Sequence, residues 1–239
     1  MDTQSTLGKL YLIPTTLGDT NPLDVIPLPV KKHVERIDYY IAENEKTARR
    51  SIKNLVPSKK QNLLHFKTLN KFTQATEIPT FLDSCKAGYD TGLLSEAGVP
   101  GVADPGAEIV KLAHQNGIQV VPLVGPSSIL LAMMASGMNG QAFSFNGYLP
   151  IDKKEKKQAL KQLERISSEK NMAQIFIETP YRNNKLLEDM IQTLHPTTKL
   201  CVAADITLSS EYILTLPISA WKQKKVDLHK RPTIFIIQK

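Results

Sequence analysis

The sequence lacks the features that mark secreted, membrane-spanning and metal-binding proteins. No apolar run in its 239 residues reaches the roughly 18 residues that a membrane-spanning helix needs, and the N-terminal stretch MDTQSTLGK has no apolar signal-peptide segment. The two cysteines, Cys85 and Cys201, belong to no paired motif, and the five histidines have no metal-ligand spacing. We therefore expect a cytoplasmic protein with reduced thiols, no membrane segment and no bound metal.

Two familiar phosphate-binding loops are also missing. The sequence contains neither the G-x-x-x-x-G-K-S/T pattern of a P-loop nor the G-x-G-x-x-G turn of a dinucleotide-binding fold. A glycine-rich loop in this chain must therefore be interpreted in another way.

The composition is that of an ordinary globular protein with a positive net charge. Hydrophobic residues make up 41% and charged residues 22% of the chain, and the formal net charge is +7. A positive charge of this size favours a polyanionic partner. Two basic clusters carry much of it: Lys46, Arg49, Arg50 and Lys53, which share one face of a predicted helix, and Lys153, Lys154, Lys156, Lys157 and Lys161. Each cluster fits either phosphate contacts or a solvated helix face, and neither has interleaved aromatic residues for stacking on bases.

Short apolar runs alternate with helical patterns along the chain, which indicates an α/β architecture. Strands are expected at 7–14, 36–43, 62–66, 90–95, 118–124, 172–178, 199–207, 212–217 and 233–238, and helices at 45–55, 78–88, 107–116, 129–136 and 183–194. A further helix should begin at a capping box formed by Asp152 and Glu155. The chain changes character after residue 124. We predict an α/β domain over 1–124 and a second α/β domain with a mixed sheet over 125–239.

The stretch LLSEAGVPGVADPG, residues 93–106, has three glycines and two prolines directly after a predicted strand. Asp104 is expected to cap the following helix and Pro105 to occupy its first position. Ligands of open α/β sheets bind beyond the carboxyl ends of strands, where this loop is expected. The glycines allow close approach to the backbone, and Glu96 without a nearby lysine suits a ligand with hydroxyls and a positive charge. The alternative is a tight connection between packed elements.

Together with the later stretches VVPLVGPSS, FNGYLP and FIETPYR, this loop resembles the tetrapyrrole methylase superfamily. It is most similar to the ribosomal RNA small subunit methyltransferase I branch, which methylates a ribose 2′-hydroxyl of 16S ribosomal RNA. The resemblance covers nearly the whole chain and is most specific between about residues 93 and 182. It implies two α/β domains with S-adenosylmethionine in the cleft between them, a homodimer, and ribosomal RNA as partner.

The resemblance also implies which residues bind the cofactor. The methionine-binding loop of the family falls on Ser95, Glu96, Ala97, Gly98, Val99 and Pro100. Pro14 would line the floor of the cleft, Ser128 and Ile129 would contact the cofactor from the next helix, and Tyr181 is a further candidate. The family usually has aspartate where this chain has Glu96.

Methyl transfer to a ribose hydroxyl needs a base, because a hydroxyl is a weak nucleophile. Glu43 is the first candidate, since it ends a predicted strand and keeps its position in the family motif. Glu178 and Glu211 are further candidates, and each of the three also fits a structural or surface role.

The chain departs from the family pattern near its ends. Leu17, Gly18 and Asp19 are kept at the N-terminal motif, but the preceding Gly-Asn pair is lost, and Pro22, Pro27 and Pro29 predict an extended segment there instead of a helix. The motif around 205–211 lacks its basic member. The acceptor therefore stays open between RNA and a tetrapyrrole or other small molecule, and a non-catalytic RNA-binding or assembly protein of the same fold is a third alternative.

Overall fold

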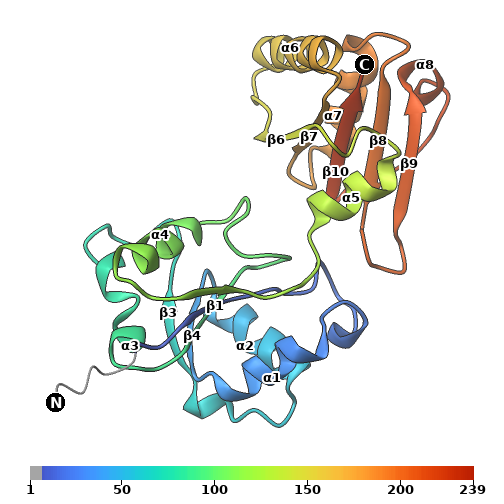
Figure 1. Ribbon diagram of the computed structural model, residues 1–239. Coiled ribbons are helices and arrows are strands. Elements are labelled where there is room, and N and C mark those ends of the chain that lie inside the picture. Colours follow the sequence, from blue (N-terminus) through green and yellow to red (C-terminus); the bar gives the residue numbers. More distant parts are fainter. Residues whose placement is uncertain (1–6) are drawn as a thin grey trace. The chain divides into compact units, whose positions relative to one another are not determined.

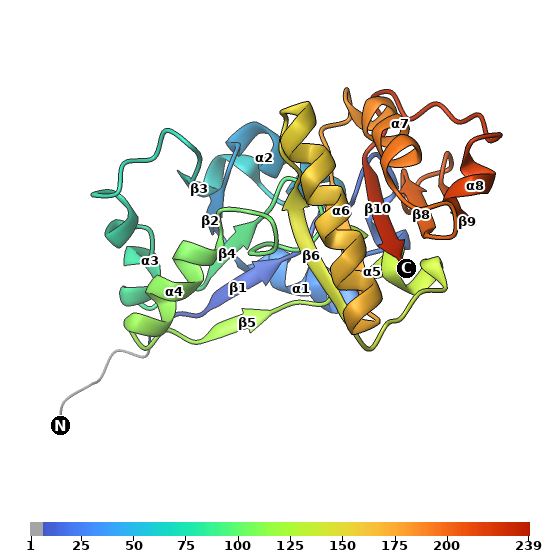
Figure 2. The ribbon, with the colours of Figure 1, turned by 90° about the horizontal axis from the view of Figure 1, so that it is seen from above.

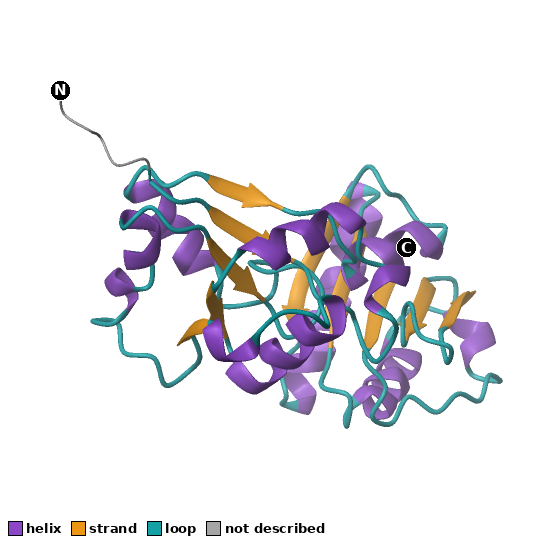
Figure 3. Cartoon of the chain, turned by 90° about the horizontal axis from the view of Figure 1, so that it is seen from below, coloured by secondary structure: helices purple, strands orange, loops and turns teal. Residues whose placement is uncertain are grey.

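The computed structural model describes residues 7–239 and divides into two compact units, of which the first ends at Ser127 and the second covers Ser128–Lys239 (Figure 1). Each unit contains one five-stranded sheet with helices packed against it (Figure 3). The predicted α/β class is confirmed. Within the described residues, the structure contains no helix with both the length and the apolar character required to cross a membrane.

The first unit is built on an all-parallel sheet of strand order β3-β2-β4-β1-β5 (Figure 2). Its strands are β1 (Leu10–Ile13), β2 (Tyr39–Ala42), β3 (His65–Thr68), β4 (Thr91–Leu94) and β5 (Val120–Pro122). Its helices are α1 (Leu28–Arg36), α2 (Glu45–Leu55), α3 (Asp83–Lys86) and α4 (Ala107–Gln115), with short 3-10 turns η1 (Pro22–Asp24), η2 (Gln61–Leu63) and η3 (Ile78–Thr80).

Successive side chains of the strands point to opposite faces, so each face has its own core. Tyr11 and Ile13 of β1 pack with α1 and α2, whereas Leu10 packs with α3 and α4. Because all strands run in one direction, the loops after β1, β2 and β4 meet at one edge of the sheet. This edge carries the candidate site.

Three local expectations for the first unit are wrong. The prolines do not exclude a helix: Pro27 is the N-cap of α1 and Pro29 lies in its first turn, where a missing N–H costs nothing. Asp104 does not cap α4, whose N-cap is Gly106. Its Oδ1 atom instead accepts the backbone N–H groups of Gly106 at 2.8 Å and Gly101 at 3.4 Å. The helix expected over 78–88 is split into η3 and α3, because the chain turns between them to bury Phe81 and Leu82.

The second unit has a mixed sheet of order β6-β7-β10-β8-β9, in which only the β6–β7 pair of these described strands is parallel. Its strands are β6 (Phe143–Tyr148), β7 (Ala173–Ile177), β8 (Lys199–Ala204), β9 (Tyr212–Pro217) and β10 (Thr233–Gln238). Its helices are α5 (Ser128–Ser136), α6 (Lys153–Lys170), α7 (Asn183–Thr193) and α8 (Ile218–Trp221). Helices α6 to α8 share a core with one face of the sheet. The Thr215 hydroxyl, which points to the other face, donates to the carbonyl of Ser136 in α5.

The start expected for α6 is confirmed: Asp152 is its N-cap and accepts the N–H groups of Lys154 and Glu155 at 2.9 Å each. Strand β6 was not expected from the sequence. Its register shifts between Phe145 and Tyr148, and Gly147 has a φ of +62°, so the period-2 pattern of a regular strand is broken.

Candidate active site

The loop after β4, residues 95–106, is tied to the chain that leaves β1. The Thr15 N–H donates to the carbonyl of Gly98 at 2.9 Å, and the Thr15 hydroxyl donates to the carbonyl of Ser95 at 3.3 Å. The Ser95 hydroxyl donates to the same Gly98 carbonyl at 3.0 Å. Pro14 is buried beside them and lies against Gly125, where an added Cβ would come within 2.2 Å of the Pro14 ring. Two strand ends therefore hold this loop in one conformation.

Three residues of the same loop have a positive φ. Gly98 has a φ of +78° and Gly101 a φ of +81°, and Ala103 adopts a φ of +56° although it carries a Cβ. A Cβ on Gly98 would lie 3.1 Å from the Leu17 side chain and 3.2 Å from the carbonyl oxygen of Pro126, whereas one on Gly101 would meet nothing within 4 Å. The glycine at 98 is thus needed for both its conformation and its close neighbours. Strained backbone of this kind persists where the surroundings over-determine it, often at functional sites.

Three carboxylates meet beside the loop. Glu43 directly follows β2, Asp104 lies in the loop, and Glu96 lies near its start. Burial is the main cause that raises the pKa of Glu43 to about 7, and the charge of Asp104, a hydrogen bond to its side chain and the charge of Glu96 add to the shift. A carboxyl with this pKa exchanges its proton near neutral pH, as a general base does.

Glu96 is oriented from α2. Its Oε1 atom accepts the Thr47 hydroxyl at 2.7 Å, and that hydroxyl also lies 3.0 Å from the Asn44 carbonyl. Asn44 is the N-cap of α2, with its side chain accepting the N–H groups of Lys46 and Thr47. The helix start and the carboxylate are thus part of one hydrogen-bonded arrangement.

The other two acidic candidates lie in the second unit and have local partners. Glu178 is buried and accepts the Arg182 guanidinium at 2.6 Å and the Thr179 N–H at 2.7 Å. Glu211 is exposed and accepts the Thr207 N–H at 2.8 Å. These contacts fit structural roles.

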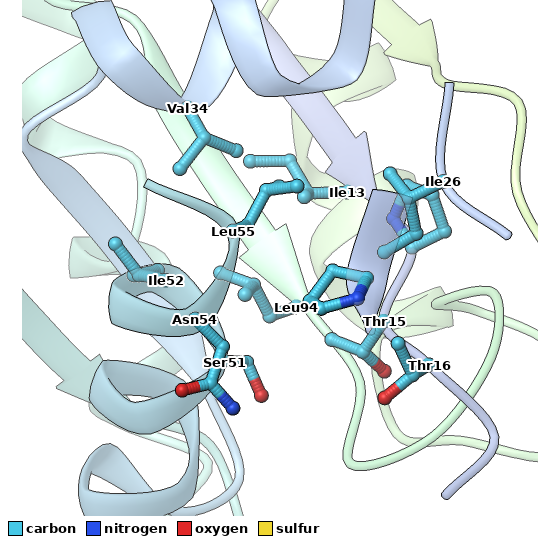
Figure 4. Close-up of a pocket in the computed structure, with 12 residues that line it drawn as sticks. Ile13, Thr15, Thr16, Ile26, Val34, Ser51, Ile52, Asn54, Leu55 and Leu94 are labelled. Carbon is cyan, nitrogen blue, oxygen red and sulfur yellow. The ribbon is translucent and has the colours of Figure 1, made fainter. Parts of the chain in front are cut away.

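A cavity of about 440 Å³ opens between the chain after β1, helix α2 and the start of the loop. Its lining residues are Thr16, Leu17, Gly18, Asp19, Thr20, Thr47, Arg50, Ser51, Asn54, Glu96 and Ala97. A small apolar pocket of about 30 Å³ adjoins it and shares Thr16, Ser51 and Asn54 with it. In Figure 4 these three side chains lie on one side of that pocket, while Ile13, Val34, Leu55 and Leu94 line the rest. The polar cavity therefore adjoins the hydrophobic core.

The structure divides the basic face expected on α2. Arg49 pairs with Glu45 at 2.7 Å, donates to the carbonyls of Gln61 and Leu64, and lies 4.6 Å from the centre of the Phe66 ring. It is therefore held by intramolecular contacts and cannot join a shared phosphate-binding face. The second basic cluster is divided in the same way, because Lys156 is buried and bonds to Asp189 at 3.2 Å.

The expected cofactor residues fall into two sets. Pro14, the loop 95–100 and Glu43 lie together in the first unit. Ser128 and Ile129 begin α5, and Tyr181 lies before α7 with 70% of its surface exposed and its ring 5.8 Å from that of His229. Sequence reasoning missed Thr15, Thr47 and the carboxyl role of Asp104. The sequence could have indicated Asp104, because it lies in the glycine-rich loop. It could not have indicated Thr15 and Thr47, because their contacts with Ser95 and Glu96 join segments that are far apart along the chain.

Comparisons with known proteins were made against this geometry. The family described as Tetrapyrrole (Corrin/Porphyrin) Methylases matches residues 9–221. A Vibrio cholerae protein named ribosomal RNA small subunit methyltransferase I is 29% identical over 88% of this chain and 69% of its own length. A Bacillus subtilis protein of the same name is 32% identical over 90% of this chain and 70% of its own. The solved structure of uroporphyrin-III C-methyl transferase from Thermus thermophilus complexed with S-adenyl homocysteine is similar in fold, with a TM-score of 0.57 and 15% identity over 97% of this chain and 98% of that one.

Proposed function

The chain belongs to the tetrapyrrole methylase family, and from that premise we propose that it transfers a methyl group from S-adenosylmethionine to a ribose 2′-hydroxyl of small-subunit ribosomal RNA. It is an S-adenosylmethionine-dependent methyltransferase. The observation that supports RNA as acceptor is the name shared by relatives that are similar along most of the chain. We further propose that it acts in the cytoplasm as a homodimer.

The loop residues fit the cofactor. At Gly98 a side chain would meet Leu17 and the Pro126 carbonyl, so glycine keeps this part of the loop in the conformation that the proposed cofactor site needs. The exposed carboxylate of Glu96 suits the ammonium group of a methionine moiety. We therefore assign the methionine end to Glu96, Ala97 and Gly98, with Pro14, Ser95, Val99 and Pro100 supporting the loop. Ser128, Ile129 and Tyr181 are the further cofactor residues that the family resemblance implies. When bound, S-adenosylmethionine supplies an electrophilic methyl group on a sulfonium.

Glu43 is the proposed base. The acceptor hydroxyl becomes a better nucleophile as its proton moves to a carboxylate, and this carboxyl has a pKa of about 7. The charge of Asp104 and a hydrogen bond to its side chain add to the burial that raises the pKa of Glu43, and the Oδ1 atom of Asp104 is fixed by the N–H groups of Gly101 and Gly106. Most of the remaining rate enhancement comes from positioning, which supplies up to roughly 7–11 kcal/mol in favourable cases.

The test is mass mapping of ribosomal RNA from cells with and without the gene. We expect one nucleotide of the small-subunit RNA to lose a ribose methyl group in the deletion strain and to regain it on complementation with the wild-type gene. Small subunits from the deletion strain should also accept a labelled methyl group from S-adenosylmethionine in vitro. An unchanged RNA together with methylation of a tetrapyrrole would contradict the RNA proposal. Cofactor binding without methylation of either acceptor would favour the assembly protein.

A further inference from the structure

The 440 Å³ cavity beside the cofactor loop has an unusual lining. Helix α2 presents Thr47, Arg50, Ser51 and Asn54 to it, at the i, i+3, i+4 and i+7 spacing of one helix face. The chain after β1 adds the hydroxyls of Thr16 and Thr20 and the carboxylate of Asp19. The cavity is thus lined by hydroxyl, amide and charged side chains. Its volume lies in the range of pockets that hold small-molecule ligands.

Arg50 differs from its neighbour Arg49 in what it touches. Arg49 is held by Glu45, two backbone carbonyls and the Phe66 ring. The Arg50 side chain is exposed, lines the cavity and makes no hydrogen bond or ion pair with any other residue in 7–239. A guanidinium placed this way keeps all five of its donors for a ligand, and its planar fork matches a phosphate.

The charges of the cavity favour one class of ligand. Its lining contains a single cation, Arg50, and two carboxylates, Asp19 and Glu96. The one cation can pair with a single phosphate and the carboxylates can accept hydrogen bonds from hydroxyl groups, whereas the many carboxylates of a uroporphyrin would face one cation and two like charges. A nucleotide unit of RNA combines one phosphate with ribose hydroxyls, and both halves find partners here.

We propose that this cavity holds the nucleotide of the acceptor strand, with Arg50 contacting a phosphate and the polar side chains of Ser51, Asn54 and Thr16 contacting the ribose or base. The assignment rests on the proposed function. Glu96 and Ala97 belong both to the cavity and to the cofactor loop, so a nucleotide in the cavity lies directly beside the proposed methyl donor site. The recognition of the acceptor is thus built on α2, a regular element that can hold it rigidly.

The test measures binding of an unmodified transcript of small-subunit ribosomal RNA at several salt concentrations. We expect Arg50→Ala to weaken binding roughly tenfold and to make the slope of log affinity against log salt shallower by about 0.9, the value for one lost phosphate contact. Arg50→Lys should restore the slope but not the full affinity, because a lysine cannot form the bidentate contact. In methyl transfer to small subunits, the KM for RNA should rise while calorimetric affinity for S-adenosylmethionine stays the same.

Lys53→Ala is the matched control. Lys53 lies on the same helix, is exposed and carries the same charge, but it does not line the cavity. We expect its slope to match that of the wild type. If Lys53→Ala and Arg50→Ala lose the same RNA affinity, RNA binds a diffuse basic surface and the assignment is overturned. A salt dependence that is unchanged in Arg50→Ala would overturn it as well. A wild-type protein that neither binds nor methylates RNA would instead contradict the proposed function.

Discussion

Glu43 illustrates how neighbours decide the chemistry of a single residue. Its carboxyl lies at the end of β2, partly buried, where Asp104 and Glu96 add negative charge from another part of the chain. Burial and like charges both disfavour the ionised form, so they raise its pKa together. An exposed carboxyl such as Glu108 on α4 lacks this environment.

Glu43→Gln should remove the base. We expect turnover to fall by about 10²–10⁴-fold, because glutamine cannot accept the proton. In the wild type, the rate should rise as pH increases through about 7, the pKa of Glu43, and then level off. The pH profile of methyl transfer with saturating cofactor measures both effects. Glu108→Gln should keep both the rate and the profile. If Glu43→Gln keeps wild-type turnover, the base must be sought elsewhere.

The same pKa has a consequence for stability. The folded pKa of about 7 lies above the ordinary value of 4.5, so the proton stabilises the folded state below about pH 4.5, and this contribution is lost as pH rises towards 7. Glutamine does not ionise. Glu43→Gln should therefore be more stable than the wild type above pH 7, by on the order of 1 kcal/mol after allowance for solvent screening, and the difference should shrink at pH 5. Urea unfolding at both pH values measures this, and a gain that is equal at both would argue against ionisation as its cause.

At the level of elements, the loop between β4 and α4 is shaped by its anchors as much as by its glycines. Hydrogen bonds from Thr15 and Ser95 fix its first half, and Asp104 fixes its second half through two N–H groups. The strained φ of Ala103 is held between these anchors. A rigid loop of this kind presents its backbone to a ligand without an ordering cost at the moment of binding.

Two glycines of this loop provide a matched pair of variants. Gly98→Ala and Gly101→Ala both place a Cβ at positive φ, and each should lose about 1–2 kcal/mol of stability for that reason. Only the Cβ at 98 also meets Leu17 and the Pro126 carbonyl, at 3.1 and 3.2 Å. We therefore expect Gly98→Ala to weaken S-adenosylmethionine binding by more than tenfold, while Gly101→Ala stays within a few-fold of the wild type, as measured by calorimetric titration. Equal affinities in both variants would remove Gly98 from the proposed cofactor site.

On the scale of the whole molecule, each unit has its own sheet and its own core. Two buried clusters cover the faces of the first sheet and one large cluster lies under α6 to α8 in the second unit. The second unit also keeps apolar side chains at its surface, among them Tyr148 at 62% and Ile151 at 70% exposure.

The homodimer is tested by mass. Sedimentation equilibrium should give about twice the chain mass of 26.6 kDa at micromolar concentration. On dilution in a concentration series, the dimer should dissociate into monomers. The Arg50→Ala variant should have the same mass as the wild type, because Arg50 lines a cavity formed by one chain. A monomer over the whole series would contradict the proposed assembly.

Local sequence was enough to predict those features that depend on residues close together along the chain. The alternation of apolar runs indicated the α/β class, Asp152 and Glu155 placed the start of α6, and the glycines marked a loop at a strand end. Their causes lie within one turn of helix or one loop, where intrinsic propensity and backbone geometry dominate. The errors over Pro27 and Asp104 were also local: a proline is compatible with the start of a helix as well as with an extended segment, and an aspartate can accept N–H groups within a loop as well as at an N-cap.

The candidate site depended on contacts between segments that are far apart along the chain. Arg49 and Arg50 are adjacent and chemically identical, yet the fold of η2 and β3 around one of them leaves only the other to the cavity. Burial first, and then the charges of a loop that follows a different strand, raise the pKa of Glu43, and Asp189 of α7 pairs with Lys156 and so removes it from a basic cluster. Charge spacing describes one helix face alone, whereas desolvation and pairing depend on what is packed against that face. For this reason the chemistry of the cavity became visible only once the strands were assembled into a sheet.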